Sequence, residues 1–239
     1  MLEIKAIASG STGNAYLLDD GAGHKLLLEC GVPFKALLKA LDFNLIQLSG
    51  CLLTHEHKDH SKCVKDLLKH GVRVYTSKGT AEACGIKEHW NCSILGVGAM
   101  LYLNGDGWAI LPLKAEHDAA EPLMFLISND SVMGWMLFAT DTYYIRYKMP
   151  KDLRILVIEC NYSMEHLNEN IENGSVDAAR KRRILHSHMN LDTLKEFIKA
   201  NEFPALEAVY LIHMSNDNAE EDRMVKEVEE LTGVPVTAF

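Results

Sequence analysis

The segment Thr54-His55-Glu56-His57-Lys58-Asp59-His60 decides the fold, because it places four potential metal ligands within six residues, directly after the apolar run Cys51 to Leu53. His55 and His57 are two residues apart, so on an extended segment they point to the same side. Asp59 and His60 are adjacent, and a turn into a helix aims them at a second point nearby. The segment therefore predicts a loop that supplies imidazoles to one metal ion and a carboxylate with an imidazole to another.

This arrangement differs from the zincin helix motif H-E-x-x-H, because the residue four positions after His55 is Asp59. The alternative interpretation is a solvated polar loop that contains histidines by chance. A buried strand that delivers three imidazoles and one carboxylate together leaves polar groups that are costly unless they are bound. The pattern therefore favours metal ligands.

Composition limits the classes of protein to which the chain can belong. The 24 Lys and Arg residues against 33 Asp and Glu residues give a net charge of −9, which argues against a protein that coats nucleic acid through bulk positive charge. A local basic patch, or bound metal ions, can still reverse the field at one site. The six cysteines are scattered without a C-x-x-C pair, which is typical of reduced thiols in a cytoplasmic protein. The sequence contains neither a membrane-spanning apolar run nor a secretion signal, so we expect no membrane partner.

Apolar periodicity predicts the order of the elements. Strands are expected over residues 2–8, 15–18, 25–29, 51–54, 72–76, 108–113, 123–128, 132–140, 154–159, 208–213 and 234–237. Helices are expected over 34–41, 64–68, 163–171, 191–200 and 219–231. The early strands follow one another as hairpin-like pairs and the later ones alternate with helices, which predicts an α/β fold of two sheets packed face to face with helices outside. No repeat or linker marks a boundary, so one domain over residues 1–239 is expected.

The chain resembles the metallo-β-lactamase superfamily, whose signature H-x-H-x-D-H follows a strand and corresponds here to His55, His57, Asp59 and His60. Later elements of the family also occur in order: an isolated histidine at His117, an aspartate after a buried strand at Asp141, and a final histidine at a strand end at His213. Each single match is weak, but together they cover the whole chain. The resemblance implies a single four-layered αββα sandwich with two mixed sheets flanked by helices.

Finer features are similar to the small WalJ/YycJ-type members, which lack an inserted β-CASP domain and are regarded as DNA exonucleases. They are the turn Gly10 to Asn14, the run from His117 to Pro122, Glu159-Cys160-Asn161, and His188-Met189-Asn190. The chain departs from that group in Met189-Asn190, where the group favours Leu-Ser-Asn, and in Met214, which replaces a common Leu. These differences leave the ligands intact and affect only substrate details.

The resemblance implies a ligand set and a reaction. His55, His57 and His117 are expected on one ion, and Asp59, His60 and His213 on the other, with Asp141 and a hydroxide bridging the two. Imidazole and carboxylate ligands suit two Zn or Mn ions, and Fe is possible. Two such ions about 3.5 to 4 Å apart stabilise the attacking and the leaving oxygen of a phosphoryl displacement, which predicts hydrolysis of phosphodiester bonds in nucleic acid, most simply by a DNA exonuclease.

Other residues are expected to contact the substrate. His188 is a candidate for a phosphate contact or a proton donor, and a capping or surface histidine is the alternative; with Asp59 it forms the expected catalytic pair. The basic run from Arg180 to Arg183 is able to meet a nucleic-acid backbone, through Arg182 and Arg183 in particular, or to form a solvated face. Asn14 belongs to the glycine-rich turn Gly10 to Asn14, which is expected either to be a structural turn that borders the site or to provide a further substrate contact.

Two alternative functions remain open from the sequence. The first is hydrolysis of a small ester, thioester or lactone, which the acidic net charge favours. The second is a non-catalytic regulatory protein that retains the fold, which the intact ligand set makes less favourable. The sequence leaves the native metal, the polarity and strandedness of the substrate, and the oligomeric state undetermined.

Overall fold

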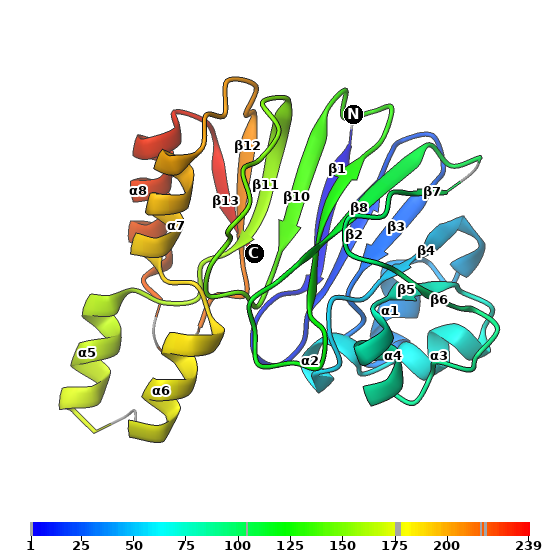
Figure 1. Ribbon diagram of the computed structural model, residues 1–239, viewed down its shortest axis with the longest axis horizontal. Helices are drawn as coiled ribbons and strands as arrows, with labels where there is room; N and C mark the ends of the chain where they lie inside the picture. The colour runs from blue at the N-terminus through cyan, green and yellow to red at the C-terminus, as the bar shows by residue number, and fades with distance from the viewer. Residues whose placement is uncertain (1, 104, 175–177, 216, 218) are drawn as a thin grey trace. The chain divides into compact units, whose positions relative to one another are not determined.

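The computed structural model describes residues 2–103, 105–174, 178–215, 217 and 219–239. The chain divides into two compact units (Figure 1). Unit 1 comprises Met1–Lys114 with Ala119–Met133, and unit 2 comprises Ala115–Asp118 with Gly134–Phe239. The prediction of one domain over residues 1–239 stays a prediction, and each unit is described by itself.

The first sheet of unit 1 follows the order of the sequence. Its strands are β1 (Glu3–Ala8), β2 (Ala15–Asp19), β3 (Lys25–Leu28), β4 (Leu48–Leu52), β5 (Val74–Thr76) and β6 (Cys92–Ile94). β1, β2 and β3 pair antiparallel, whereas β3 to β6 pair parallel. Because parallel strands end at the same edge, Leu28 lies opposite Leu52, and the residues that follow β3 and β4 emerge side by side.

The rest of unit 1 consists of an antiparallel set of strands and short helices. β7 (Leu101–Leu103), β8 (Trp108–Lys114) and β9 (Leu123–Ser128) pair antiparallel. The helices are α1 (Phe34–Ala40), η1 (Leu45–Gln47), α2 (Lys58–Ser61), α3 (Val64–Lys69) and α4 (Lys78–Ala83). Leu37 of α1 and Leu67 of α3 pack in one apolar cluster with Leu27 of β3, so these helices are anchored on the sheet.

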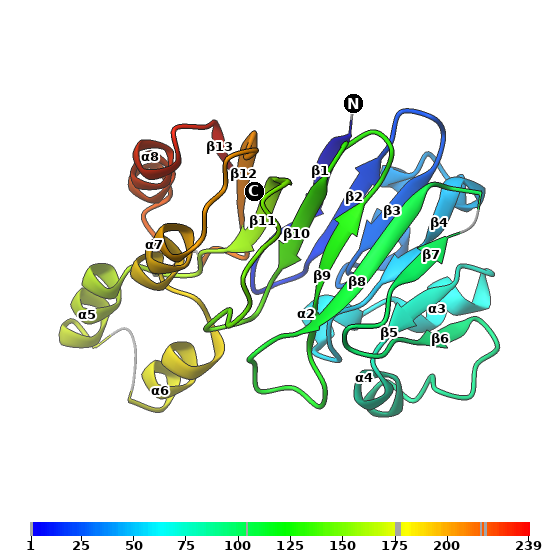
Figure 2. The ribbon, with the colours of Figure 1, turned by 45° about the horizontal axis from the view of Figure 1, so that its top comes forward.

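Unit 2 has a parallel sheet with helices beside it. β10 (Trp135–Ala139), β11 (Leu153–Glu159), β12 (Ala208–Ile212) and β13 (Val236–Ala238) pair parallel in that order. β10 and β11 are mostly buried apolar runs, as expected of strands covered on both faces. The helices are α5 (Met164–Glu172), α6 (Ala178–Ser187), α7 (Leu191–Ala200) and α8 (Glu221–Thr232). Figure 2 shows α5 beside α6, and α7 and α8 beside β12 and β13.

The predicted elements are mostly present, with specific corrections. The strand expected over residues 132–140 begins at Trp135, because Met133 has a left-handed backbone (φ 54°) that breaks the extension. The helix expected over 219–231 begins at Glu221 and ends at Thr232, where Gly233 adopts the left-handed cap. The three-residue strands β6 and β7 and the helices α4 and α6 were not predicted. The mixed α/β class is confirmed.

The sequence predicts reduced cysteines and no membrane-spanning helix. Cys30, Cys51, Cys63 and Cys160 are buried, and Cys84 and Cys92 are partly buried. Among the described residues, none of the helices combines the length and the apolar character that crossing a bilayer requires.

Candidate metal centre

The segment that carries the first ligands, residues 54–60, leads from β4 into α2 within unit 1. His57 keeps an extended backbone (φ −56°, ψ 144°) and caps α2. Nε2 of His55 lies 3.1 Å from Nδ1 of His57, and the ring centroids of His55 and His60 are 4.2 Å apart. The alternation predicted from the sequence therefore gathers three imidazoles within unit 1.

Polar groups behind these imidazoles fix their orientation. The Thr54 hydroxyl lies 2.8 Å from Nδ1 of His55, and Oε2 of Glu29 lies 3.3 Å from Nδ1 of His60. The backbone N–H of Thr54 donates to Oε1 of Glu29 at 3.1 Å. Because each Nδ1 faces a polar partner, Nε2 of His55 and His60 is the natural ligand atom. Burial raises the pKa of the Glu29 carboxyl, against the lowering effect of His60.

The glycine-rich turn Gly10 to Asn14 contacts the ligand-bearing segment, residues 54–60, through Asn14. Asn14 is buried and bonds reciprocally with the backbone of Gly10, at 3.0 Å in each direction. Its side-chain nitrogen lies 3.2 Å from Nε2 of His60, and its backbone N–H donates to the carbonyl of Asp59 at 2.7 Å. A Cβ at Gly31 would stand 1.6 Å from that same carbonyl oxygen, so only glycine permits this close approach. Oδ2 of Asp59 lies 3.5 Å from Nε2 of His60.

Unit 2 gathers a second group of ligand-type side chains at the carboxyl ends of its parallel strands. Asp141 follows β10, Glu159 ends β11, His213 follows β12, and His188 follows α6. Each offers one ligand atom, and these four atoms lie within 4.8 Å of one another. The edge of a parallel sheet where strands end is where such sites are usually found.

The Asp141 carboxylate lies between two imidazoles of unit 2. Its Oδ2 is 3.4 Å from Nε2 of His117, and its Oδ1 is 3.4 Å from Nε2 of His213. Nδ1 of His117 faces the carbonyl oxygen of Ser187 at 2.8 Å, and Nδ1 of His213 faces Oε1 of Glu159 at 3.2 Å. In the tautomer that carries the proton on Nδ1, each Nε2 has a lone pair on the side of a different oxygen of Asp141. A cation beside each oxygen fits this donor set.

The protonation of these groups follows from burial and charge. Burial lowers the pKa of His117, outweighing the nearby Asp141 carboxylate, which favours the neutral imidazole that binds metals. Burial acts to raise the pKa of Glu159, but the charge and hydrogen bond of His188 lower it overall. Burial conversely acts to lower the pKa of His188, and Glu159 raises it overall. Their bond, Nδ1 of His188 to Oε1 of Glu159, is 2.7 Å long.

Three residues at these strand ends have a left-handed backbone, which is rare outside glycine. They are Glu29 (φ 64°), Asp141 (φ 46°) and His213 (φ 54°), which follow β3, β10 and β12 respectively. Such residues cost of order 1–3 kcal/mol each and persist where the surrounding structure demands them. The strain accompanies the sharp turn that directs each side chain over the strand end.

Arg182 and Arg183, the predicted substrate contacts, line a cavity that includes Ser187, whose carbonyl oxygen faces Nδ1 of His117. Arg182 and Arg183 are exposed on α6 and line a cavity of about 390 Å³ with Asp118, His186 and Ser187. Nε of Arg183 lies 3.6 Å from Oδ2 of Asp118. The side chain of Arg180, the first residue of the basic run, lies outside the described residues.

Two buried carboxylates were missed as functional groups by the sequence analysis. Glu29 and Glu159 each end a run of buried apolar residues. An ionisable residue at the end of a buried strand costs free energy unless it is paired, and this signal was available in the sequence. Glu159 was noted only as part of a subgroup pattern, without a role.

Comparison with known proteins establishes the family. The family model of the metallo-β-lactamase superfamily matches residues 8–90. A Bacillus anthracis protein named exodeoxyribonuclease YycJ is 30% identical over 231 residues, covering 91% of this chain and 84% of its own length. The chain belongs to the metallo-β-lactamase superfamily. A Streptococcus pneumoniae superfamily protein named exodeoxyribonuclease WalJ is 28% identical over 227 residues, covering 89% of this chain and 81% of that protein.

A solved structure supports the fold of this metallo-β-lactamase superfamily member. The metallo-β-lactamase fold protein YhfI from Bacillus subtilis matches with a TM-score of 0.74 at 17% identity, covering 100% of this chain and 97% of that one. The predicted α/β class, with two mixed sheets flanked by helices, is thereby confirmed. The chain is a metal-dependent hydrolase, as the resemblance implied.

Proposed function

We propose that this chain is a dinuclear metal-dependent exodeoxyribonuclease. The position of Asp141 carries the proposal, because its two carboxylate oxygens each face a different imidazole Nε2, of His117 and of His213, at 3.4 Å. This is the donor arrangement of a carboxylate that bridges two cations. The names of the relatives from Bacillus anthracis and Streptococcus pneumoniae support DNA as the substrate.

The proposed ligands come from both ligand groups. His55, His57 and His117 would hold one ion and Asp59, His60 and His213 the other, with Asp141 shared. Two divalent cations less two carboxylates leave a formal charge of about +2, which attracts a phosphodiester although the chain is acidic. Zn and Mn both suit these nitrogen and oxygen donors, and Fe is a further candidate.

When bound, such ions lower the pKa of water toward neutrality and stabilise charge on the attacking and leaving oxygens. The side chains then perform the remaining tasks. Thr54 and Glu29 keep His55 and His60 in the tautomer that offers Nε2. Asp59 is both a ligand and a catalytic residue in this proposal. Asn14 holds the backbone of Asp59 in place and, being buried, acts as support for the ligands.

His188 is proposed to donate the proton that the leaving oxygen requires. Its Nδ1 is held by Glu159 at 2.7 Å, which leaves Nε2 as the atom that holds the transferable proton. Burial acts to lower the pKa of His188, but Glu159 raises it overall, which favours the protonated ring that a proton donor needs. Arg182 and Arg183, exposed on α6, are proposed to bind phosphates of the substrate strand. We propose a cytoplasmic location, where DNA is available.

The nuclease assay tests this function directly. End-labelled single-stranded and double-stranded DNA is incubated with the protein and Mn or Zn, alongside the variants His57→Ala and His70→Ala. His70 is an exposed histidine outside both ligand groups and serves as the matched control. The proposal expects stepwise shortening of DNA by the wild type and His70→Ala and none by His57→Ala. Equal behaviour of all three, or turnover of lactones or thioesters in place of DNA, contradicts it.

A further inference from the structure

A row of lysines runs along α2 and α3, starting inside the ligand-bearing segment. Lys58, Lys62, Lys65 and Lys69, here called the lysine stripe, are all exposed and are spaced four, three and four residues apart. Lys65 and Lys69, four residues apart on α3, share one helical face, and Lys58 and Lys62 precede that helix. The opposite face is buried in the core of unit 1 through His60, Cys63, Val64, Leu67 and Leu68. Burial of that face therefore keeps the lysines of the stripe on the solvent side.

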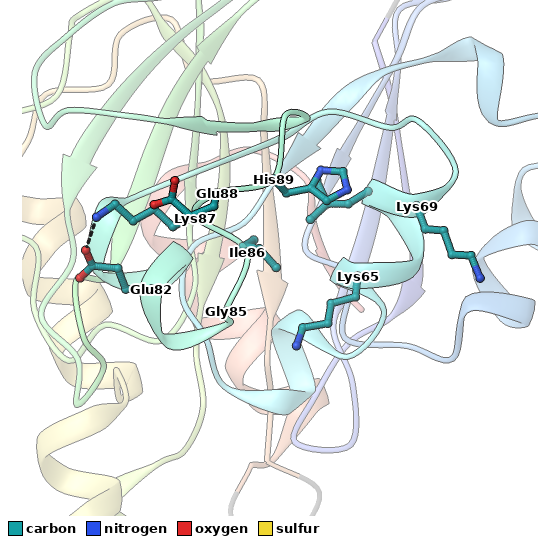
Figure 3. A pocket seen from close by; sticks show the side chains of 9 residues that line it. Lys65, Lys69, Glu82, Gly85, Ile86, Lys87, Glu88 and His89 are labelled. Atoms are coloured by element: carbon teal, nitrogen blue, oxygen red, sulfur yellow. Dashed lines mark hydrogen bonds and ion pairs between the residues drawn. The ribbon is translucent and has the colours of Figure 1, made fainter.

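The stripe borders a cavity of about 750 Å³ within unit 1 (Figure 3). Lys65 and Lys69 line it from α3, and Leu68 and Ile86 supply apolar surface. The amino group of Lys65 lies 3.8 Å from where a Cβ of Gly85 would stand, so it reaches across toward the end of α4.

The charges around the cavity are only partly compensated. Lys87 is paired with Glu82 at 2.7 Å, and Glu88 adds a second carboxylate to the lining. Within the part of the chain that the structure describes, Lys62, Lys65 and Lys69 form no ion pair. In a chain of net charge −9, uncompensated lysines gathered on one face indicate an anionic partner.

An aromatic pair adjoins the same cavity. His89 lines it, and the ring of Trp90 stacks on His89 with centroids 5.9 Å apart and planes 21° apart. Trp90 is 77% exposed, a large apolar area for a residue that usually buries most of its surface. Lysines that follow a backbone, combined with an exposed aromatic ring that stacks on a base, are typical of single-stranded nucleic-acid binding.

We propose that this surface binds single-stranded DNA, with phosphates on Lys62, Lys65 and Lys69 and an unstacked base on Trp90. The proposal rests on the proposed exodeoxyribonuclease function and specifies the form of the substrate strand. A duplex keeps its bases stacked and paired, so it gains only the phosphate contacts. An unpaired strand gains both the phosphate contacts and the stacking contact.

Binding is measured by fluorescence anisotropy on the full chain in EDTA, so that cleavage does not interfere. The probes are fluorescein-labelled dT20, a 20-base-pair duplex and rU20. The stripe variant Lys62→Gln/Lys65→Gln/Lys69→Gln is compared with the control Lys5→Gln/Lys35→Gln/Lys39→Gln, which loses the same charge from exposed positions of unit 1. Circular dichroism and melting curves establish that both variants fold.

The stripe variant is expected to bind dT20 at least about 10-fold more weakly. The magnitude of the slope of log K against log salt is expected to fall by about 2, because each of the three lost phosphate contacts contributes about 0.7. The control is expected to bind as the wild type does. Trp90→Ala is expected to weaken dT20 binding about 5- to 100-fold and to leave duplex binding unchanged.

Three results overturn the inference: equal weakening by both triple variants, unchanged binding by the stripe variant, or tighter binding of rU20 than of dT20. The outcome is independent of catalysis. If the metal-loaded wild type fails to cleave DNA while the stripe variant alone loses dT20 binding, the surface stands and the proposed nuclease function falls. If cleavage occurs while the stripe variant binds normally, the nuclease function stands and the surface falls.

Discussion

Nδ1 of His188 lies 2.7 Å from Oε1 of Glu159 in unit 2. The carboxylate is fully buried and also accepts from the backbone N–H of Met189 at 3.2 Å and of Thr142 at 3.0 Å. It therefore has a fixed position from which to orient the imidazole. A general acid needs such a fixed orientation and a pKa that keeps it protonated at the working pH.

Replacing Glu159 by Gln tests whether His188 acts as that acid. The substitution removes the charge that raises the pKa of His188, so His188 loses its proton at lower pH. An acid is active only while protonated, so the alkaline limb of the kcat profile should move to lower pH. At pH 8, kcat on DNA should fall by about 100-fold, at the lower end of the contribution of general acid catalysis. The measurement is kcat between pH 6 and 9.

The nature of the leaving group separates proton donation from a structural role. Bis-p-nitrophenyl phosphate releases a phenolate that needs no proton, so Glu159→Gln and His188→Gln should lose much less activity on it than on DNA. His188→Gln should keep the metal content of the wild type. Glu159→Gln also removes the carboxylate that faces Nδ1 of His213, so its activity is measured at saturating metal. An equal loss of activity on both substrates, or a loss of bound metal by His188→Gln, means that His188 acts as a ligand or support instead.

Asp141→Asn tests the bridging role. Asn tolerates the left-handed backbone of position 141 and has the same shape, so the fold should persist. It is neutral and offers only one carbonyl oxygen, so bound metal should fall from two ions per chain to one or fewer, and activity should fall by about 10³-fold or more. Metal analysis after dialysis measures the first effect. Asp130→Asn, at an exposed position, should behave as the wild type does.

Glu29→Gln tests the support of His60. The Gln side-chain oxygen is still able to accept from Thr54 N–H, but the negative charge that faces Nδ1 of His60 at 3.3 Å is lost. Loss of a group that contacts a metal ligand without binding the metal itself typically lowers metal affinity 10- to 100-fold. A competition titration with a metal-binding dye should show this decrease, with thermal stability measured in parallel. Unchanged affinity means that Glu29 does not position the ligand.

Metal removal should destabilise the folded chain. Ions that bind only the native state stabilise it by about 2.7 kcal/mol at 100 times Kd. For a protein of this length that corresponds to a rise in Tm of roughly 5 to 10 °C. Melting curves with Mn or Zn and with EDTA measure the difference. Identical Tm values, with metal removal shown by elemental analysis, are incompatible with ligands that contribute to the native state.

The sequence was sufficient to predict the class of fold, because the α/β class depends on local apolar patterns. The ligand set was implied by the resemblance to the metallo-β-lactamase superfamily, and it stays a prediction. His55 and His57 were placed after a buried strand by the apolar run Cys51 to Leu53, whereas Asp141 and His213 were singled out by the resemblance, and the structure places them after β10 and β12. The short strands β6 and β7 were missed, because three residues carry too little periodicity. α6 was missed because its basic run was taken as a solvated or phosphate-binding face rather than as a helix.

The supporting groups could not be predicted, because they depend on which strands are neighbours. The contact of Glu159 with His188 and His213 requires the pairing of β11 with β12 and the position of the α6 end, neither of which a local pattern specifies. The lysine stripe was also missed, because net charge was counted over the whole chain. Its significance depends on the burial of the opposite helical face, which only the packing reveals.

The most direct test of the central claim is a crystal structure of the Mn-loaded protein with anomalous diffraction data. Two anomalous peaks are expected, one bonded to Oδ2 of Asp141 beside His117 and one bonded to Oδ1 beside His213. A single peak, or peaks away from Asp141, contradicts the dinuclear centre.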